Sequence, residues 1–312
     1  MAATVLCFGN LQFDVLCRTV TALPLPGELH MIDSIDFALS GNSGNVAAAL
    51  GRLGIAVELA GYSGADIIGE QFRVTLAAIG VGTDKLLRHP TANTGTSVIA
   101  LSPGGERSVI FVNGANALFD LDTVPDAWLE GRRVISVGSV FVLPQFTGEA
   151  VGRLFARAKG HGATTVLNIC WDAEGRGSPF LKPALAETDY FILNYDEGRH
   201  LTGHTLPESI LDTLEAYTHG TVVLTLGADG CCLRGVNDLH RIPALSVEAI
   251  DCTGAGDSFV AGFIAGLVQG RSVYDCASLG CQAAAFAVTG PGSYPRIPRL
   301  AEVDQLSRTL SM

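Results

Sequence analysis

The 312-residue sequence has little charge and no long apolar run. Charged residues make up only 16% of it, and glycine and proline repeatedly interrupt the hydrophobic residues, which make up 48%. No run approaches the roughly 18 apolar residues that a membrane span needs. The net charge of −11 disfavours binding to nucleic acid or to an anionic membrane. We expect a globular protein without a membrane-spanning helix, in which any phosphate site is local.

The sequence also lacks signs of secretion and of a metal or disulfide framework. Its first residues have neither the basic segment nor the long apolar core of a signal peptide. Its eight cysteines never form C-x-x-C pairs, which argues against a zinc site. His200 and His204 have helical spacing, but no carboxylate completes a metal motif. We expect a cytoplasmic protein with reduced core thiols and with both histidines at the surface.

Short β-rich runs alternate with helical patterns along most of the chain. The predicted strands are Thr4–Phe8, Ser97–Leu101, Ser108–Val112, Val134–Val137, Thr164–Ile169, Tyr190–Leu193 and Thr221–Leu226. The predicted helices are Asn45–Leu53, Ile67–Ile79, Gly148–Gly160, Glu208–Thr218, Ala255–Val268 and Val273–Val288. This alternation indicates a doubly wound α/β domain with a mostly parallel sheet.

Two segments interrupt the alternation. One is Leu11–Leu39, and the other is the pair of strands at 97–101 and 108–112, whose connection Ser-Pro-Gly-Gly-Glu is typical of a hairpin turn. Extended segments of this kind predict a small sheet that projects from the main one and serves as a lid over the strand ends.

The most informative segment is Asp251-Cys252-Thr253-Gly254-Ala255-Gly256-Asp257, which leads into an apolar helix. Small residues let backbone N–H groups approach an anion, and the helix N-terminus adds partial positive charge, so this turn can hold a phosphoryl group without lysine. In the first helical turn the dipole favours ionised Asp257 and makes it a weak base, which phosphoryl transfer tolerates. The alternative is a tight turn in which Asp257 only caps the helix.

A second polar turn precedes another helix, at Ser40-Gly41-Asn42-Ser43-Gly44-Asn45. The amides of Asn42 and Asn45 can bind hydroxyl groups, or they can simply cap the helix. The sequence contains neither a Rossmann G-x-G-x-x-G nor a G-x-x-x-x-G-K-[ST] phosphate loop.

Together these segments resemble the signatures of the ribokinase, or PfkB, family of carbohydrate kinases. The resemblance begins at Gly9, Asn10 and Asp14, and it continues through 41–54, 194–197, 225–230, 251–257 and 280–288. It implies a three-layer α/β/α sandwich, a single domain over residues 1–312, with a β-sheet lid formed by approximately 11–39 and 93–116.

The resemblance also implies roles for individual residues. Asp257 would be the catalytic base, and Gly254, Ala255 and Gly256 would form the anion hole for the γ-phosphate of ATP. The substrate would contact Asp14, Gly41, Asn42 and Asn45. Asn194, Thr225, Gly227 and Gly230 would bind the nucleotide, Glu197 would hold Mg²⁺ through water, and Asp251 and Thr253 would match a possible K⁺ site.

The sequence departs from the family pattern at the substrate. Ser40 replaces the first glycine of the usual Gly-Gly pair, and Val140 stands where ribokinases have a sugar-binding glutamate. With Phe141 and Phe13 nearby, this suggests a less hydroxylated ring or a nucleoside. We expect an ATP-dependent kinase that phosphorylates a hydroxyl, primary by preference, of a sugar or sugar derivative. A nucleoside kinase is the alternative, and exposed lid edges suggest a homodimer through the lid.

A sensor without activity and a dinucleotide-dependent oxidoreductase are the alternatives from other classes. The intact Asp257 argues against the sensor, and the missing Rossmann motif argues against the oxidoreductase.

Overall fold

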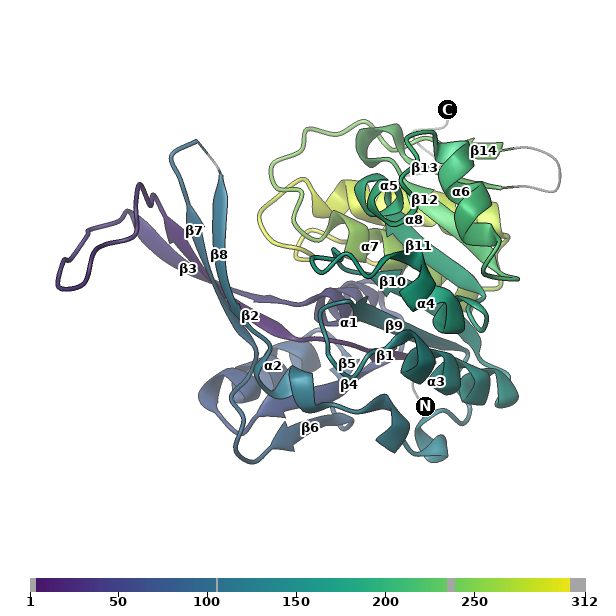
Figure 1. The fold of residues 1–312 in the computed structure, drawn as a ribbon, viewed down its shortest axis with the longest axis horizontal. Helices are drawn as coiled ribbons and strands as arrows, with labels where there is room; N and C mark the ends of the chain where they lie inside the picture. Colours follow the sequence, from purple (N-terminus) through teal and green to yellow (C-terminus); the bar gives the residue numbers. More distant parts are fainter. Residues whose placement is uncertain (1–3, 105, 235–238, 304–312) are drawn as a thin grey trace.

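A computed structural model describes residues 4–104, 106–234 and 239–303, which form a large sheet covered by helices and a smaller sheet that projects from it (Figure 1). Gly105, in the predicted hairpin turn, lies outside the described residues. Among the residues described, no helix is long and apolar enough to cross a membrane.

The large sheet has the strand order β14-β13-β12-β11-β10-β9-β1-β4-β5, and β6 pairs with β4. All its pairs are parallel except β12–β13 and β13–β14. Its strands are β1 (Val5–Phe8), β4 (Val57–Gly64), β5 (Val81–Gly82), β6 (Leu86–His89), β9 (Val134–Val140), β10 (Thr164–Ile169), β11 (Tyr190–Asn194), β12 (Thr221–Thr225), β13 (Cys231–Arg234) and β14 (Leu239–Ile242).

Helices cover both faces of this sheet because its strands are apolar on both sides. In β1, Val5 and Cys7 pack into one core and Leu6 and Phe8 into the other, and all four are fully buried. The first core is covered by α1 (Asn42–Leu53), α2 (Ile67–Ala78), α7 (Ala255–Val268) and α8 (Val273–Ala287). The second is covered by α3 (Gly148–Gly160), α4 (Gly177–Leu185), α5 (Tyr195–Thr202) and α6 (Pro207–Glu215). The predicted α/β/α arrangement is confirmed.

Short 3-10 helices lie in the connections: η1 (Gly114–Leu118), η2 (Leu121–Thr123), η3 (Asp126–Trp128) and η4 (Gly227–Asp229). The predicted elements are present with shifts of a few residues at their ends. The shift that matters most for function is at the start of α1. This helix begins at Asn42 and not at Asn45, so both asparagines lie in its first turn.

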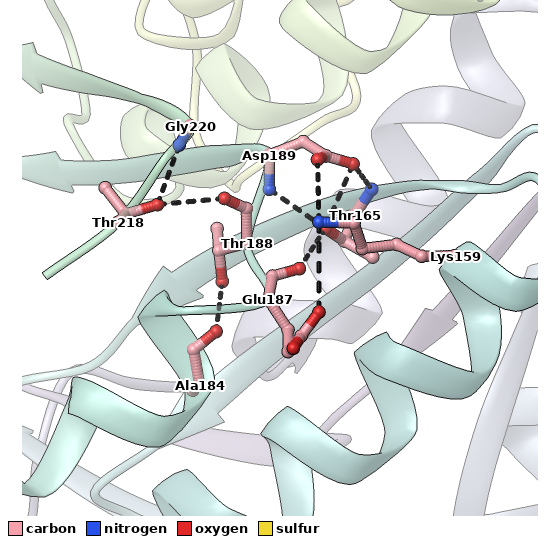
Figure 2. A network of polar contacts seen from close by, with 8 residues as sticks. All are labelled: Lys159, Thr165, Ala184, Glu187, Thr188, Asp189, Thr218 and Gly220. Atoms are coloured by element: carbon pink, nitrogen blue, oxygen red, sulfur yellow. Dashed lines mark hydrogen bonds and ion pairs between the residues drawn. The ribbon is translucent and has the colours of Figure 1, made fainter.

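The starts of β10, β11 and β12 are tied together by a polar network (Figure 2). The Asp189 carboxylate accepts from the Thr165 backbone N–H at 2.9 Å, and Thr165 Oγ1 donates to the Glu187 carbonyl at 2.7 Å. Thr218 Oγ1 donates to the Thr188 carbonyl at 3.0 Å. These contacts occupy the amino ends of the parallel strands and leave the carboxyl ends for a site.

The small sheet has the order β3-β2-β7-β8, with β2 (Gln12–Arg18), β3 (Ser34–Ser40), β7 (Thr96–Leu101) and β8 (Arg107–Val112). Its pairs are antiparallel except β2–β7, which is parallel. Figure 1 shows that it extends well beyond the body of the molecule, on the same side as the loops that precede α7.

Candidate active site

The candidate site lies at the carboxyl ends of β1, β9, β10, β11 and β12. The strand order reverses between β1 and β9, because the chain first builds β4 and β5 on one side of β1 and later adds β9 to β12 on the other. Such a switch point leaves a crevice in which α/β proteins bind ligands. Here the crevice is a central cavity of about 460 Å³, and the polar turns before α1 and α7 both line it.

Asp257 lies in the first turn of α7, where two amides hold its carboxylate. Asn42 Nδ2 donates to Oδ1 and Asn45 Nδ2 donates to Oδ2, each at 2.8 Å. Burial raises the pKa of Asp257 to about 7, although both hydrogen bonds act to lower it. The expectation that the helix dipole makes Asp257 a weak base was therefore wrong, because desolvation is the larger effect.

The turn before α1 explains why both amides point at Asp257. Gly41 has φ 95°, and a Cβ there would lie 2.6 Å from the Asn10 carbonyl oxygen, so the turn packs directly on the residues that follow β1. Asn10 Oδ1 accepts from the Asn42 backbone N–H at 2.9 Å and from Ser139 Oγ at 2.6 Å. Neither Asn42 nor Asn45 caps α1, so the capping alternative is wrong.

The turn before α7 has the small residues that an anion hole needs. Gly254 is the N-cap at φ 74°, and a Cβ there would lie 2.2 Å from the Ser293 Cβ. A Cβ on Gly256 would meet no atom within 4 Å, because this position faces open space. Both glycines and Ala255 line the central cavity, next to Asp257. Asp257 is not an N-cap, so that alternative is wrong as well.

The small sheet supplies another wall of the cavity. Asp14 of β2, Ser97 of β7 and Phe111 of β8 are cross-strand neighbours and line the cavity together. Asp14 Oδ1 accepts a hydrogen bond from Ser97 Oγ. Burial raises the pKa of Asp14, against the opposing effects of Ser97, Ser40 and the charge of Arg107.

Four buried amide oxygens in this cavity have no hydrogen-bond partner within the described residues. They are Gln12 Oε1, Asn42 Oδ1, Asn45 Oδ1 and Asn168 Oδ1. Buried polar atoms are rarely left unpaired, so these oxygens are available acceptors for a hydrogen-bond donor. The sequence analysis missed Gln12 and Asn168. Asn168 lies near the carboxyl end of β10, and a polar residue at that end of a predicted buried strand was the available signal.

The expected apolar wall is made by other residues. Val140 is fully buried in β9, Phe141 packs on Phe180, and Phe13 stacks on Phe37, and none of the three lines the cavity. Ile99, Phe111 and Val142 line it instead. The prediction failed because Val140 is still part of the buried strand β9, and the rings of Phe141 and Phe13 pack on other aromatic rings.

Asn194 and Glu197 form a reciprocal pair at the start of α5. Asn194 Oδ1 accepts from the Glu197 backbone N–H at 2.8 Å, and Glu197 Oε2 accepts from that of Asn194 at 2.9 Å. The two residues therefore cap the helix and also line the central cavity. Burial, with a contribution from the charge of Asp257, raises the pKa of Glu197 to about 7.

A second cavity of about 410 Å³ adjoins the first. Of the residues expected to bind the nucleotide, Thr225, Gly227 and Gly230 line this cavity, whereas Asn194 lines only the central cavity. Its other walls are largely apolar: Ala244, Leu245, Val247, Ala249, Phe259, Ala284 and Val288. Thr225, Cys252, Ala255 and Gly256 line both cavities, so the two meet at the turn before α7.

The expectations for the cysteines and for the two histidines had different outcomes. All eight cysteines are unpaired, but Cys252 is exposed in the turn before α7, so it is not a core thiol. His200 and His204 are exposed as expected, and the ring of His200 stacks on Trp171 at 4.4 Å.

Asp251 organises the same turn. Its Oδ1 accepts from the Thr253 backbone N–H at 2.9 Å and its Oδ2 from that of Gly292 at 3.2 Å. Burial opposes ionisation, yet these contacts and the charge of Arg107 leave the pKa of Asp251 below its usual value.

A partly buried carboxylate at the start of a helix, with a polar cavity beside it and a largely apolar cavity adjoining, is an arrangement that an α/β phosphotransferase can use. Residues 2–300 match the family described as "pfkB family carbohydrate kinase". The chain therefore belongs to the PfkB family, and it is a kinase that phosphorylates sugar hydroxyls.

Curated relatives match over nearly the whole chain. A ribokinase of Staphylococcus aureus (strain COL) is 28% identical, covering 98% of this chain and 100% of its own. A fructokinase of Escherichia coli is 28% identical, covering 97% and 99%. A deoxyribokinase of Salmonella typhi is 25% identical, covering 94% and 96%.

Solved structures share the fold. Arabidopsis thaliana ribokinase, complexed with ribose and ATP, superposes with a TM-score of 0.88 at 23% identity, covering 98% of this chain and 99% of the other. An Escherichia coli protein described as a ribokinase II, in complex with ATP and Mg²⁺, gives 0.81 at 21% identity, covering 98% and 99%.

Proposed function

We propose that this kinase transfers the γ-phosphoryl group of Mg·ATP to a hydroxyl, preferentially a primary one, of a polyhydroxylated sugar, with Asp257 as the base. The observation that carries the proposal is the place of Asp257 in the central cavity, next to the turn where the two cavities meet, with its carboxylate held by Asn42 and Asn45. A carboxylate with a pKa of about 7 can accept a proton near neutral pH.

The two cavities differ in the ligands that they suit. The apolar second cavity suits a flat purine base, with Thr225, Gly227 and Gly230 along the nucleotide. The central cavity suits the sugar, which would donate hydroxyl groups to Asp14 and to the unpaired amide oxygens. The phosphoryl group would then cross at Gly254, Ala255 and Gly256.

Glu197 and Asn194 suit a magnesium ion. No cluster of three or more His, Cys, Asp or Glu side chains in the described part of the chain could hold a metal alone. Magnesium in kinases needs few protein ligands, because water and substrate phosphates supply most of its oxygens. The negative charge of Asp257 also raises the pKa of Glu197, and a bound cation would offset this repulsion. When bound, the ion would neutralise charge on the phosphate oxygens.

The residues of this chain would then act in a simple sequence. Asn42 and Asn45 orient the Asp257 carboxylate, which accepts the hydrogen bond of the attacking hydroxyl. As the hydroxyl oxygen bonds to the γ-phosphorus, the bond to the ADP oxygen breaks and the proton passes to Asp257. The N–H groups at the start of α7 stabilise the charge on the transferring group.

Replacing Asp257 with Asn tests the base. The variant keeps the shape of the residue but cannot accept the proton, so kcat should fall about 10²–10⁴-fold. ATP affinity, measured by calorimetry, should change little. Turnover close to that of the wild type would reject Asp257 as the base.

A panel of pentoses, hexoses, ketoses, polyols and nucleosides tests the acceptor. The unpaired amide oxygens favour a compound with several hydroxyl groups. The apolar side chains of Ile99, Phe111 and Val142 favour the alternative, a nucleoside whose base packs on them. Turnover with nucleosides alone would select the alternative.

Activation by a monovalent cation is a further part of the proposal. Asp251 is ionised and lies beside the turn before α7, with Thr253 two residues on. Exchanging K⁺ for a bulky organic cation at constant ionic strength should lower the rate. An unchanged rate would remove this part and leave the rest intact.

A homodimer through the small sheet is supported by the face that points away from the cavity. Phe37, Val15, Val98 and Ile110 form one row across all four strands, and Phe37 and Ile110 are 66% and 61% exposed. A second copy would bury this row. Light scattering should give a dimer mass that Ile110→Asp reduces to a monomer, and a monomeric wild type would exclude it.

A further inference from the structure

Arg107 connects the small sheet to the turn that precedes α7. It is the first residue of β8, opposite Leu101 and therefore at the outer end of the sheet. Its Nη2 donates to Thr253 Oγ1 at 3.2 Å and lies 3.9 Å from Asp251 Oδ1. The contact spans 146 positions of sequence and joins the two walls of the central cavity.

The charges around the cavity make this arginine distinctive. The lining residues include the carboxylates of Asp14, Glu197 and Asp257, and none of those described is a lysine or arginine. Arg107 is not among the lining residues, but its positive charge acts to lower the pKa of both Asp14, whose pKa burial nevertheless raises, and Asp251. The charge of the guanidinium therefore acts on a carboxylate of the small sheet, Asp14, and on a carboxylate of the turn before α7, Asp251.

Fold stability does not explain the contact. The Arg107 side chain is 56% exposed, and exposed pairs of this kind contribute little to folding because water competes with them. A guanidinium has five N–H donors, and one hydrogen bond to Thr253 leaves others for a ligand. The contact therefore matters for the position of the small sheet over the cavity and not for folding.

We propose that Arg107 is a positioning residue that latches the small sheet onto the anion hole when sugar and ATP are bound. This inference rests on the proposed function. The sugar contacts the sheet at Asp14, and the γ-phosphate contacts the turn at Gly254–Gly256, so the latch couples the two binding events. It also restricts entry of water beside the phosphoryl group.

Loss of the Arg107 contact should uncouple the cleavage of ATP from the phosphorylation of the sugar. With the sheet less firmly closed, a water oxygen can attack the γ-phosphorus in place of the sugar hydroxyl. The bond to the ADP oxygen breaks, and the products are ADP and inorganic phosphate. The ratio of phosphate to sugar phosphate therefore reports the latch, and a residue that merely supports the fold would not change it.

The experiment compares Arg107→Ala and Arg107→Lys with Arg18→Ala as a matched control. Arg18 lies on β2 in the same row as Arg107, and it pairs with Asp36 inside the sheet at 3.0 Å. With the best sugar of the panel, sugar phosphate and inorganic phosphate are measured together. Arg107→Ala should lower kcat/KM for the sugar about tenfold or more and raise the phosphate ratio by a similar factor. Lysine should restore part of both, and Arg18→Ala should match the wild type.

A double variant identifies the partner. Thr253→Val removes the acceptor for Arg107, so adding it to Arg107→Ala should increase the uncoupling less than additively. Equal phosphate ratios for Arg107→Ala and Arg18→Ala would overturn the latch while leaving the proposed function standing. A wild type that phosphorylates no sugar would reject the proposed function itself.

Discussion

The Asp257 carboxylate and the Asn42 amide are hydrogen-bonded at 2.8 Å across 215 positions of sequence. A donated hydrogen bond stabilises the ionised carboxylate, so it opposes the burial that raises the pKa of Asp257 to about 7. The amide of Asn42 on α1 therefore lowers the basicity of the Asp257 carboxylate on α7.

The wild-type rate should follow the ionisation of Asp257. Because the base must be deprotonated, kcat/KM should be level above about pH 7 and fall about tenfold per unit at lower pH. Replacing Asn42 with Ala removes a hydrogen bond that lowers the pKa, so the fall should begin at higher pH. Rates from pH 5.5 to 9 check this, and a fall that begins at lower pH would contradict the role of Asn42.

The two glycines of the proposed anion hole should respond differently to alanine. A Cβ at Gly256 meets nothing within 4 Å, and alanine favours a helix, so Gly256→Ala should fold with an unchanged or higher Tm. The methyl group would nonetheless occupy the space of the phosphate, so ATP should bind at least about tenfold more weakly.

Gly254→Ala should instead lower Tm, because its positive φ and the contact with Ser293 both oppose a side chain. Thermal melts and calorimetry with ATP separate the two effects. Unchanged ATP affinity in Gly256→Ala would argue against an anion hole at this position.

The layered sheet and the small-residue turns could be predicted from sequence because they depend on local patterns. Helices α3 and α7 have the predicted bounds, since α3 has a clear apolar periodicity and α7 is a long apolar segment that follows a small-residue turn. Strand β4 was missed because its sequence Val-Glu-Leu-Ala-Gly-Tyr-Ser-Gly contains two glycines, and α5 was missed because it is largely polar.

The content of the site was less predictable because it depends on distant pairings. The end of β9 at Val140 decides which residues reach the cavity, and pairing with Ile169 of β10 extends the strand to that point. Likewise, Arg107 and Thr253 are neighbours only because two turns far apart in sequence meet. The raised pKa of Asp257 reflects desolvation by residues from distant parts of the chain, which no local pattern reports.

Asn168 should affect the sugar and not the nucleotide. Its Oδ1 is buried and has no hydrogen-bond partner in the described part of the chain. The residue lines the central cavity but not the second cavity. Asn168→Leu has a similar volume but accepts no hydrogen bond, so KM for the sugar should rise about tenfold with KM for ATP unchanged. Initial rates with each substrate varied in turn check this. An equal rise in both constants would indicate a general distortion.

Gly138 should be needed for the arrangement of the asparagines. It lies in β9, and a Cβ there would be 1.8 Å from Asn42 Oδ1 and 3.0 Å from Asn168 Oδ1. Gly138→Ala should therefore displace Asn42 from Asp257 and lower kcat/KM about 10²-fold, with a modest fall in Tm. The acid limb of the pH profile should also move to higher pH, as for Asn42→Ala, because Asp257 loses the same hydrogen bond. Gly160→Ala at the end of α3, where a Cβ meets nothing, is the control and should match the wild type. A Gly138→Ala enzyme of normal rate and normal pH profile would show that Asn42 does not set the basicity of Asp257.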